Sequence, residues 1–228
     1  VWAGDTPGSR LHFAAAPKPH CHLFPGLAPL LWADRIAIAR FSHMNLLCEQ
    51  GDLALRPLED RQEEYALLRH WLSQEEISRY YGGNGEREVR SIQKHVKIGD
   101  VCSCLILQNL EPIGYLQFYE ITDPDEKVEL RLCPYRHPFG IDLFLGVPQK
   151  LGQGVGTRCL EMTCHFLFSK RDADALCIDP RIDNPRAIRC YQKAGFFHVT
   201  TKEHGEKVLD RWVACDIMHR LPESPSSI

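Results

Sequence analysis

The sequence predicts an α/β or α+β domain built on a mixed sheet. Short apolar or alternating segments, typical of strands, are separated along the chain by segments with helical spacing of apolar residues. The composition agrees with a globular protein, since 44% of the 228 residues are hydrophobic and 25% are charged. A chain of this length can bury a substantial core.

The regular pattern starts at Leu53 and first predicts a strand, two helices and a hairpin. Leu53, Leu55 and Pro57-Leu58 alternate as in a strand, and residues 59–72 place apolar side chains at helical spacing. Residues 87–98 predict a second helix, which ends at Gly99. The hairpin is predicted over residues 101–108 and 112–121.

The second half of the chain predicts four more strands and two crossover helices. We expect strands at residues 140–147, 175–178, 199–201 and 208–218, and helices at residues 154–170 and 184–194. The polar residues His204-Gly205-Glu206 predict the turn between the last two strands. One carboxylate, Asp142, interrupts the otherwise apolar strand 140–147.

Residues 1–43 differ from the rest, because they are rich in proline, alanine and glycine and show no sustained period. We expect an irregular leader there, either non-native or disordered, and one domain over residues 44–228. No apolar run approaches the roughly 20 residues of a membrane-spanning helix, and the first residues do not resemble a secretory signal. The 10 cysteines form no paired framework, so we expect reduced thiols and a cytoplasmic protein.

The charge balance argues against nucleic acid as a partner. Lysine and arginine number 27 against 30 acidic residues, a formal net charge of −3, which provides no basic field. The acidic residues are concentrated between Glu120 and Glu129. This stretch either attracts a cation or is a solvated loop. No ligand pair lies at zinc spacing, so we expect no metal.

A glycine loop provides the first chemical signal. Gly152-Gln153-Gly154-Val155-Gly156-Thr157 lies between a predicted strand and a predicted helix, where backbone N–H groups and the helix dipole can hold phosphate. The loop lacks both the lysine of the Walker pattern and the GxGxxG of a dinucleotide fold. The alternative is a tight turn from strand to helix.

A second signal follows in the predicted helix 184–194. Asn184 starts this helix and is either an N-cap or a ligand-binding amide. Tyr191 lies two turns further on and is either a core tyrosine or a phenol available to a leaving group.

The two signals together resemble motifs of the Gcn5-related N-acetyltransferase superfamily. They are Gly154-x-Gly156-Thr157 and the segment that runs from Asn184-Pro185-Arg186 through Tyr191 to Gly195-Phe196. The resemblance covers residues 52–221. Within the superfamily the chain is most similar to the aminoglycoside 6′-N-acetyltransferases, on the following motifs: Trp71-Leu72, Tyr80-Tyr81-Gly82-Gly83, Glu111-Pro112-Ile113-Gly114-Tyr115, Gln117, Gly140-Ile141-Asp142, Leu145 and Asp179-Pro180. This implies a single domain whose mixed, mostly antiparallel central sheet is flanked by helices.

The resemblance implies acetyl-CoA as cofactor. Its pyrophosphate would bind the amides of Gln153, Gly154, Val155, Gly156 and Thr157, and its pantetheine would pair with the strand that contains Leu145. Asn184 would bind the cofactor arm, and Tyr191 would face the departing thiolate. One departure is Leu151, where many members carry Arg or Gln; Gln149 offers a side chain nearby.

The acceptor amine must lose a proton before it attacks a thioester, and Asp142 is the best candidate to accept that proton. The alternative is a turn or bulge residue that pairs with an arginine. Asp179 ends a strand at the sheet edge where ligands bind, and with Asp142, Glu126 and Glu129 it would form an anionic pocket. The resemblance adds Tyr80 to this substrate set.

The implied function is transfer of acetyl to the 6′-amino group of aminoglycosides, which confers resistance. The alternatives are a protein N-terminus, a polyamine or a siderophore-precursor amine as acceptor, or a binding module without chemistry. The residues favour neither a monomer nor a homodimer.

Overall fold

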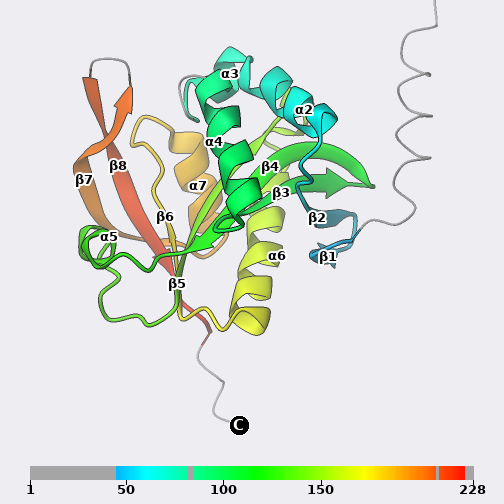
Figure 1. Cartoon of the computed structure of the whole chain (residues 1–228). Helices are drawn as coiled ribbons and strands as arrows, with labels where there is room; N and C mark the ends of the chain where they lie inside the picture. The colour runs from blue at the N-terminus through cyan, green and yellow to red at the C-terminus, as the bar shows by residue number, and fades with distance from the viewer. Residues whose placement is uncertain (1–44, 82–84, 209–210, 224–228) are drawn as a thin grey trace, which may run out of the picture. The chain divides into compact units, whose positions relative to one another are not determined.

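The computed structural model describes residues 45–81, 85–208 and 211–223. The predicted leader, residues 1–43, and the predicted Gly82-Gly83 motif lie outside this part of the chain. Within these ranges, eight strands form one sheet in the order β1-β2-β3-β4-β5-β6-β8-β7, in which only β5 and β6 pair in parallel (Figure 1). The expected mixed, mostly antiparallel sheet is therefore confirmed.

The strands are β1 Cys48–Gln50, β2 Leu53–Pro57, β3 Cys102–Gln108, β4 Glu111–Glu120, β5 Pro138–Leu145, β6 Ala175–Ile178, β7 Phe197–Val208 and β8 Arg211–Arg220. The helices are α2 Gln62–Leu72, α3 Glu75–Ser78, α4 Gly85–Ile98, α5 Pro124–Glu129, α6 Val155–Lys170 and α7 Pro185–Lys193, with a short 3₁₀ turn, η1, at Pro148–Lys150.

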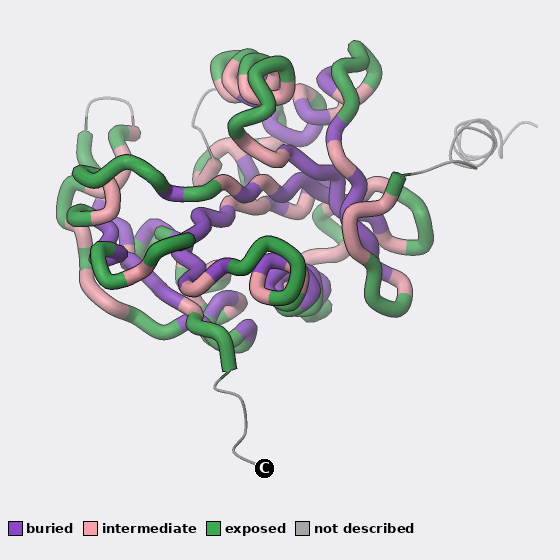
Figure 2. Tube along the Cα trace, turned by 60° about the horizontal axis from the view of Figure 1, so that its bottom comes forward, coloured by how far each residue is buried: buried purple, intermediate pink, exposed green. Residues whose placement is uncertain are grey.

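Helices cover both faces of the sheet, and the alternation of side chains along each strand supplies the two cores. Leu53 and Leu55 of β2 belong to the core that includes α6 and α7, whereas Ala54 between them packs in the core with α2 and α4. Figure 2 shows the resulting distribution, with buried residues along the strands and exposed residues on the outer surfaces of the helices.

The sheet opens between β5 and β6, and this opening positions the site. β5 pairs with β4 along its whole length, from Phe139 opposite Glu120 to Leu145 opposite Gly114. Its pairing with β6 stops at Gly140. Within the described residues, the β6-facing edge of residues 141–145 therefore has no strand partner. The helices that follow these two strands, α6 and α7, pack against each other.

The predicted turn at His204-Gly205-Glu206 is wrong. β7 continues through these residues to Val208, and its pairing with β8 shifts register between Lys202 and Glu206. A Cβ on Gly205 would lie 2.6 Å from the Cβ and Sγ of Cys215, so the glycine permits a close approach of two strands at a bulge.

The acidic stretch 120–129 is also more ordered than a solvated loop. It contains α5, whose N-cap Asp123 accepts a hydrogen bond from the Glu126 backbone N–H at 2.9 Å, with Pro124 in the first turn. In the described ranges, no helix has both the length and the apolar character that a membrane crossing needs.

Candidate active site

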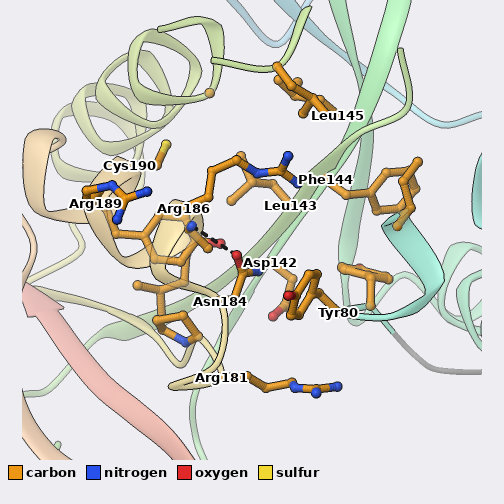
Figure 3. Close-up of a pocket in the computed structure, with 18 of the residues that line it drawn as sticks. Tyr80, Asp142, Leu143, Phe144, Leu145, Arg181, Asn184, Arg186, Arg189 and Cys190 are labelled. Atoms are coloured by element: carbon orange, nitrogen blue, oxygen red, sulfur yellow. Dashed lines mark hydrogen bonds between the residues drawn. The ribbon is translucent and has the colours of Figure 1, made fainter. Parts of the chain in front are cut away.

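A cavity of about 680 Å³ lies where β5 and β6 separate. Its walls come from β5, the glycine loop, the loop after β6 and α7, together with the end of α3, two residues of β7 and one residue each of β4, α4, β6 and β8. The cavity brings together ten of the residues predicted from the sequence: Tyr80, Asp142, Leu145, Gly154, Val155, Gly156, Thr157, Asp179, Asn184 and Tyr191. Figure 3 shows Tyr80, Asp142, Leu145 and Asn184 among the labelled residues around it.

The glycine loop has the backbone conformation that holds an anion. Gly152 and Gly154 have φ of +73° and +76°, in the left-handed region that glycine tolerates, and Gly154 immediately precedes α6. Added Cβ atoms at these two positions would meet nothing within 4 Å, so the space beside the loop is open. The first N–H groups of α6 have no partner within the helix and are available to a ligand.

Gln153 contributes only its backbone to this loop. Its side-chain amide donates a hydrogen bond to the carbonyl of Gln149, and the residue does not line the cavity. Leu151, at the position where the family often has Arg or Gln, does line the cavity with its apolar side chain.

Asn184 and Tyr191 both have structural contacts and both line the cavity. Asn184 Oδ1 accepts a hydrogen bond from the Ala187 backbone N–H at 3.2 Å, so the residue caps α7 while it lines the cavity. Tyr191 is 9% exposed and packs against Phe196, with 6.4 Å between ring centroids. Burial raises the pKa of Tyr191, so its phenol stays protonated at neutral pH and is a hydrogen-bond donor.

Asp142 is held by a chain of polar side chains inside the sheet. Its Oδ2 accepts a hydrogen bond from Gln117 Nε2 at 2.8 Å, and the Tyr115 hydroxyl lies 2.8 Å from both Gln117 Oε1 and Ser103 Oγ. The register is regular where Gln117 faces Asp142, and no ion pair of the described residues includes Asp142. The alternative of a bulge residue paired with an arginine is therefore wrong. Burial raises the pKa of Asp142, and the Gln117 hydrogen bond opposes this shift.

Four further carboxylates, Glu76, Glu88, Asp179 and Glu206, line the same cavity as Asp142. Burial is the largest cause of the raised pKa of Glu88, Asp179 and Glu206, followed for Glu88 and Asp179 by the charge of Asp142. The pKa of Asp179 reaches about 7. Asp179 is exposed at the cavity, and the protein around the cavity reduces the solvation of its charge.

Sequence reasoning missed Glu88 and Glu206 as site residues, although both carry a signal. Glu88 lies four residues before the buried Ile92 and therefore on the inner side of α4. Glu206 follows Gly205 within a strand pattern, and such a glycine often marks a bulge that redirects a side chain.

Glu126 and Glu129 lie apart from the main cavity. They line a second cavity of about 110 Å³, which shares Asp179 with the first. Glu129 pairs with Lys202, with 2.7 Å between Oε1 and Nζ. The structure therefore places these two predicted substrate residues on the α5 side of Asp179.

Arg181 fixes the wall of the cavity that contains Tyr80. Its guanidinium forms two hydrogen bonds with the Asp183 carboxylate, at 3.0 and 2.7 Å, and a third with the Arg79 carbonyl at 2.7 Å. The guanidinium carbon is 5.3 Å from the Tyr80 ring centroid, and the Tyr80 hydroxyl donates to the Asp183 carbonyl at 3.3 Å. A buried arginine thus joins the end of α3 to the loop before α7.

The family model described as an acetyltransferase (GNAT) domain matches residues 60–203. The chain belongs to this family. Its curated relatives include the aminoglycoside N(6′)-acetyltransferases type 1 of Klebsiella pneumoniae and Serratia marcescens, each 30% identical over 152 residues, or 59% of this chain and 70% of the relative.

Solved structures give the same family. The aminoglycoside acetyltransferase AAC(6′)-Ib in complex with coenzyme A and kanamycin is 26% identical, with a TM-score of 0.57 over 74% of this chain and 94% of that chain. The complex of the same protein with ribostamycin and coenzyme A has a TM-score of 0.58. This GNAT acetyltransferase is thus homologous to aminoglycoside 6′-N-acetyltransferases, and the predicted family is confirmed.

Proposed function

We propose that this GNAT acetyltransferase transfers the acetyl group of acetyl-CoA to the 6′-amino group of aminoglycoside antibiotics and thereby confers resistance. One observation carries the proposal: a single cavity joins a glycine loop at a helix N-terminus and an unpaired strand edge to a group of five carboxylates. A polyanionic donor and a polycationic acceptor can therefore meet in one cavity.

The donor side fits acetyl-CoA, which would supply an acetyl group activated as a thioester. The N–H groups of Val155, Gly156 and Thr157 at the start of α6 would hold its diphosphate. The open edge of residues 141–145 offers backbone partners for the amides of the pantetheine arm, in the manner of an added strand. The amide nitrogen of Asn184 is a further donor, because the cap of α7 uses only its oxygen.

The acceptor side fits a molecule with several ammonium groups, as aminoglycosides have. Glu88, Asp142, Asp179 and Glu206 surround this part of the cavity, and the raised pKa of each shows that burial opposes its charge. Bound ammonium groups would add to the positive charges of Arg87, Arg181 and Lys202, which already act on these carboxylates, and would favour their ionised form.

Proton handling is assigned to Asp142 and Tyr191. A carboxylate whose pKa is raised by burial is a stronger base than an exposed one, and Gln117 holds Asp142 in a fixed orientation. Asp142 would orient the acceptor ammonium and take its proton, directly or through water. The Tyr191 hydroxyl keeps its proton and would donate a hydrogen bond to the departing sulfur.

The names of the relatives support the same acceptor, since those proteins are described as aminoglycoside N(6′)-acetyltransferases and one was solved with kanamycin. A cytoplasmic location is part of the proposal. It is supported by the cysteines, since all nine in the described residues are free thiols.

An acceptor panel tests the proposal. The purified chain is mixed with acetyl-CoA, and thiol release is followed with kanamycin, tobramycin, spermidine and a peptide with a free N-terminus. We expect turnover with the two antibiotics and little with the other amines. Preference for spermidine or the peptide would assign another acceptor, and binding of both ligands without thiol release would indicate a binding module.

A further inference from the structure

Lys202 of β7 is the one cation among the described residues that line the small cavity of about 110 Å³. Three carboxylates line the same cavity: Glu126 and Glu129 of α5, and Asp179. Asp179 also lines the main cavity. One side of this carboxylate therefore faces the acceptor end of the main cavity, and the other side faces the small cavity that contains Lys202.

The bulge in β7 places charges of opposite sign around Asp179. Where β7 has residues 202–206, the paired part of β8 has only residues 213–215. The Cα atoms of Lys202 and Glu206 therefore lie roughly 7 Å apart, instead of roughly 13 Å in a regular strand. Glu206 lines the main cavity and Lys202 lines the small one. Asp179 thus has a carboxylate neighbour in one cavity and an ammonium neighbour in the other.

An ion pair fixes the ammonium group of Lys202. Its Nζ lies 2.7 Å from Glu129 Oε1, and this contact joins β7 to α5 (Figure 1). The Lys202 side chain is 29% exposed, whereas that of Glu129 is 51% exposed, so water screens the charge of Glu129 more effectively. The lysine charge still acts on the interior, because it lowers the pKa of Asp179, Glu126 and Cys215 against the burial that raises all three.

Asp179 has more acidic than basic neighbours. The charged groups on the elements around it are Glu88 of α4, Asp142 of β5, Glu126 and Glu129 of α5, Arg181, and Glu206 and Lys202 of β7. Burial raises the pKa of the other titratable neighbours, which stay uncharged at neutral pH: Tyr119, Cys177, Tyr191 and Cys215. Of the two cations, Arg181 is paired with Asp183, whereas Lys202 acts on Asp179.

We propose that Lys202 is a positioning residue for the acceptor site: its ammonium group favours the ionised form of Asp179 at neutral pH, and so sets the pH range in which a polyammonium acceptor binds. This inference rests on the proposed function. An ionised Asp179 attracts the ammonium groups of an acceptor, whereas a protonated Asp179 does not. Lys202 also repels these ammonium groups. Its charge should therefore help binding below pH 7 and oppose binding at high pH, where Asp179 is ionised in any case.

Lys202→Met tests the inference, because methionine keeps much of the side-chain length without the charge. A carboxyl NMR titration of the ligand-free protein, with the Asp179 signal assigned through Asp179→Asn, should show that the pKa of Asp179 rises above the wild-type value of about 7. One pKa unit is a factor of ten in the ionisation equilibrium, so we expect calorimetry at pH 6.5 to show roughly fivefold weaker kanamycin binding. At pH 8.5 the variant should bind kanamycin as tightly as the wild type, or more tightly.

Two control variants isolate the charge of Lys202. Lys202→Arg keeps this charge and should restore the wild-type pH dependence. Lys207→Met removes an exposed lysine of the same strand that lines neither cavity, and should leave both measurements unchanged. Comparing variant and wild type at the same pH cancels the titration of the antibiotic's own amines.

The two proposals fail in different ways. If Lys202→Met changes the affinity by the same factor at both pH values, or if the pKa of Asp179 does not rise, the role of Lys202 is overturned but the proposed function is not. If the wild type does not bind kanamycin at any pH, the proposed function is overturned, and the titration of the ligand-free protein still tests the action of Lys202 on Asp179.

Discussion

Replacing Asp142 by asparagine should separate catalysis from stability. The Gln117 amide can still donate to the asparagine oxygen, and no cation of the described residues loses an ion-pair partner. Loss of a general base typically costs 10²–10⁴ in rate, or about 3–5 kcal/mol of transition-state stabilisation. We therefore expect kcat/KM for kanamycin to fall by about that factor at pH 7.5.

The stability should move in the other direction. An aspartate whose pKa is raised on folding binds more protons in the native state than in the unfolded state, so its contribution to stability falls as pH rises through that window. Asparagine removes this penalty, so the melting temperature at pH 7.5 should equal or exceed that of the wild type. Because Asp142 also raises the pKa of Asp179, that pKa should fall below about 7 in the variant.

The assays are thiol release for kcat/KM, thermal unfolding followed by circular dichroism, and a carboxyl NMR titration for Asp179. Glu161→Gln, an exposed carboxylate on α6 outside the cavity, is the matched control and should change none of the three. An Asp142→Asn variant that keeps more than about a tenth of the wild-type kcat/KM would refute the assigned base, given the usual size of such effects.

Three further predictions follow from single contacts. Gly154→Ala and Gly99→Ala both place a methyl group at a positive φ in open space, so each should destabilise the fold by about 1 kcal/mol. Only Gly154 lines the cavity, so only Gly154→Ala should weaken coenzyme A binding in calorimetry. Arg181→Ala removes the hydrogen bonds to Asp183 and to the Arg79 carbonyl, so we expect the free energy of unfolding, measured with denaturant, to fall by about 1–2 kcal/mol. The KM for the antibiotic should rise, while the KM for acetyl-CoA stays unchanged. Unchanged KM for the antibiotic would show that this contact does not shape the acceptor site. Because the pKa of Asp179 is about 7, the affinity for the antibiotic should rise from pH 6 to pH 7.5, and binding at pH 6.5 should release protons. Calorimetry in buffers of different ionisation enthalpy measures this release. Uptake of protons on binding would contradict the prediction.

Local signals made the donor side of the site predictable from the sequence. The glycines before α6 and the Asn-Pro start of α7 act through backbone conformation and capping within a few residues, and the structure places both at the cavity. Asp142 was found because it is the one carboxylate in an apolar strand. These features depend little on the rest of the fold.

The acceptor side depends on long-range packing and was only partly predictable. Glu206 enters the cavity because β7 has a bulge where Gly205 meets Cys215, and that contact is invisible without the pairing of β7 with β8. The acidic stretch looked like one cluster, but α5 places Glu126 and Glu129 in a separate small cavity. Their role as substrate contacts stays a prediction.

A comparison of a 6′-amino aminoglycoside with its 6′-hydroxyl analogue under identical conditions tests which group accepts the acetyl. We expect thiol release with the 6′-amine only, and an acetyl group on the 6′-nitrogen when the product is examined by NMR. Equal thiol release with the 6′-hydroxyl analogue, or acetyl on another nitrogen, would contradict it.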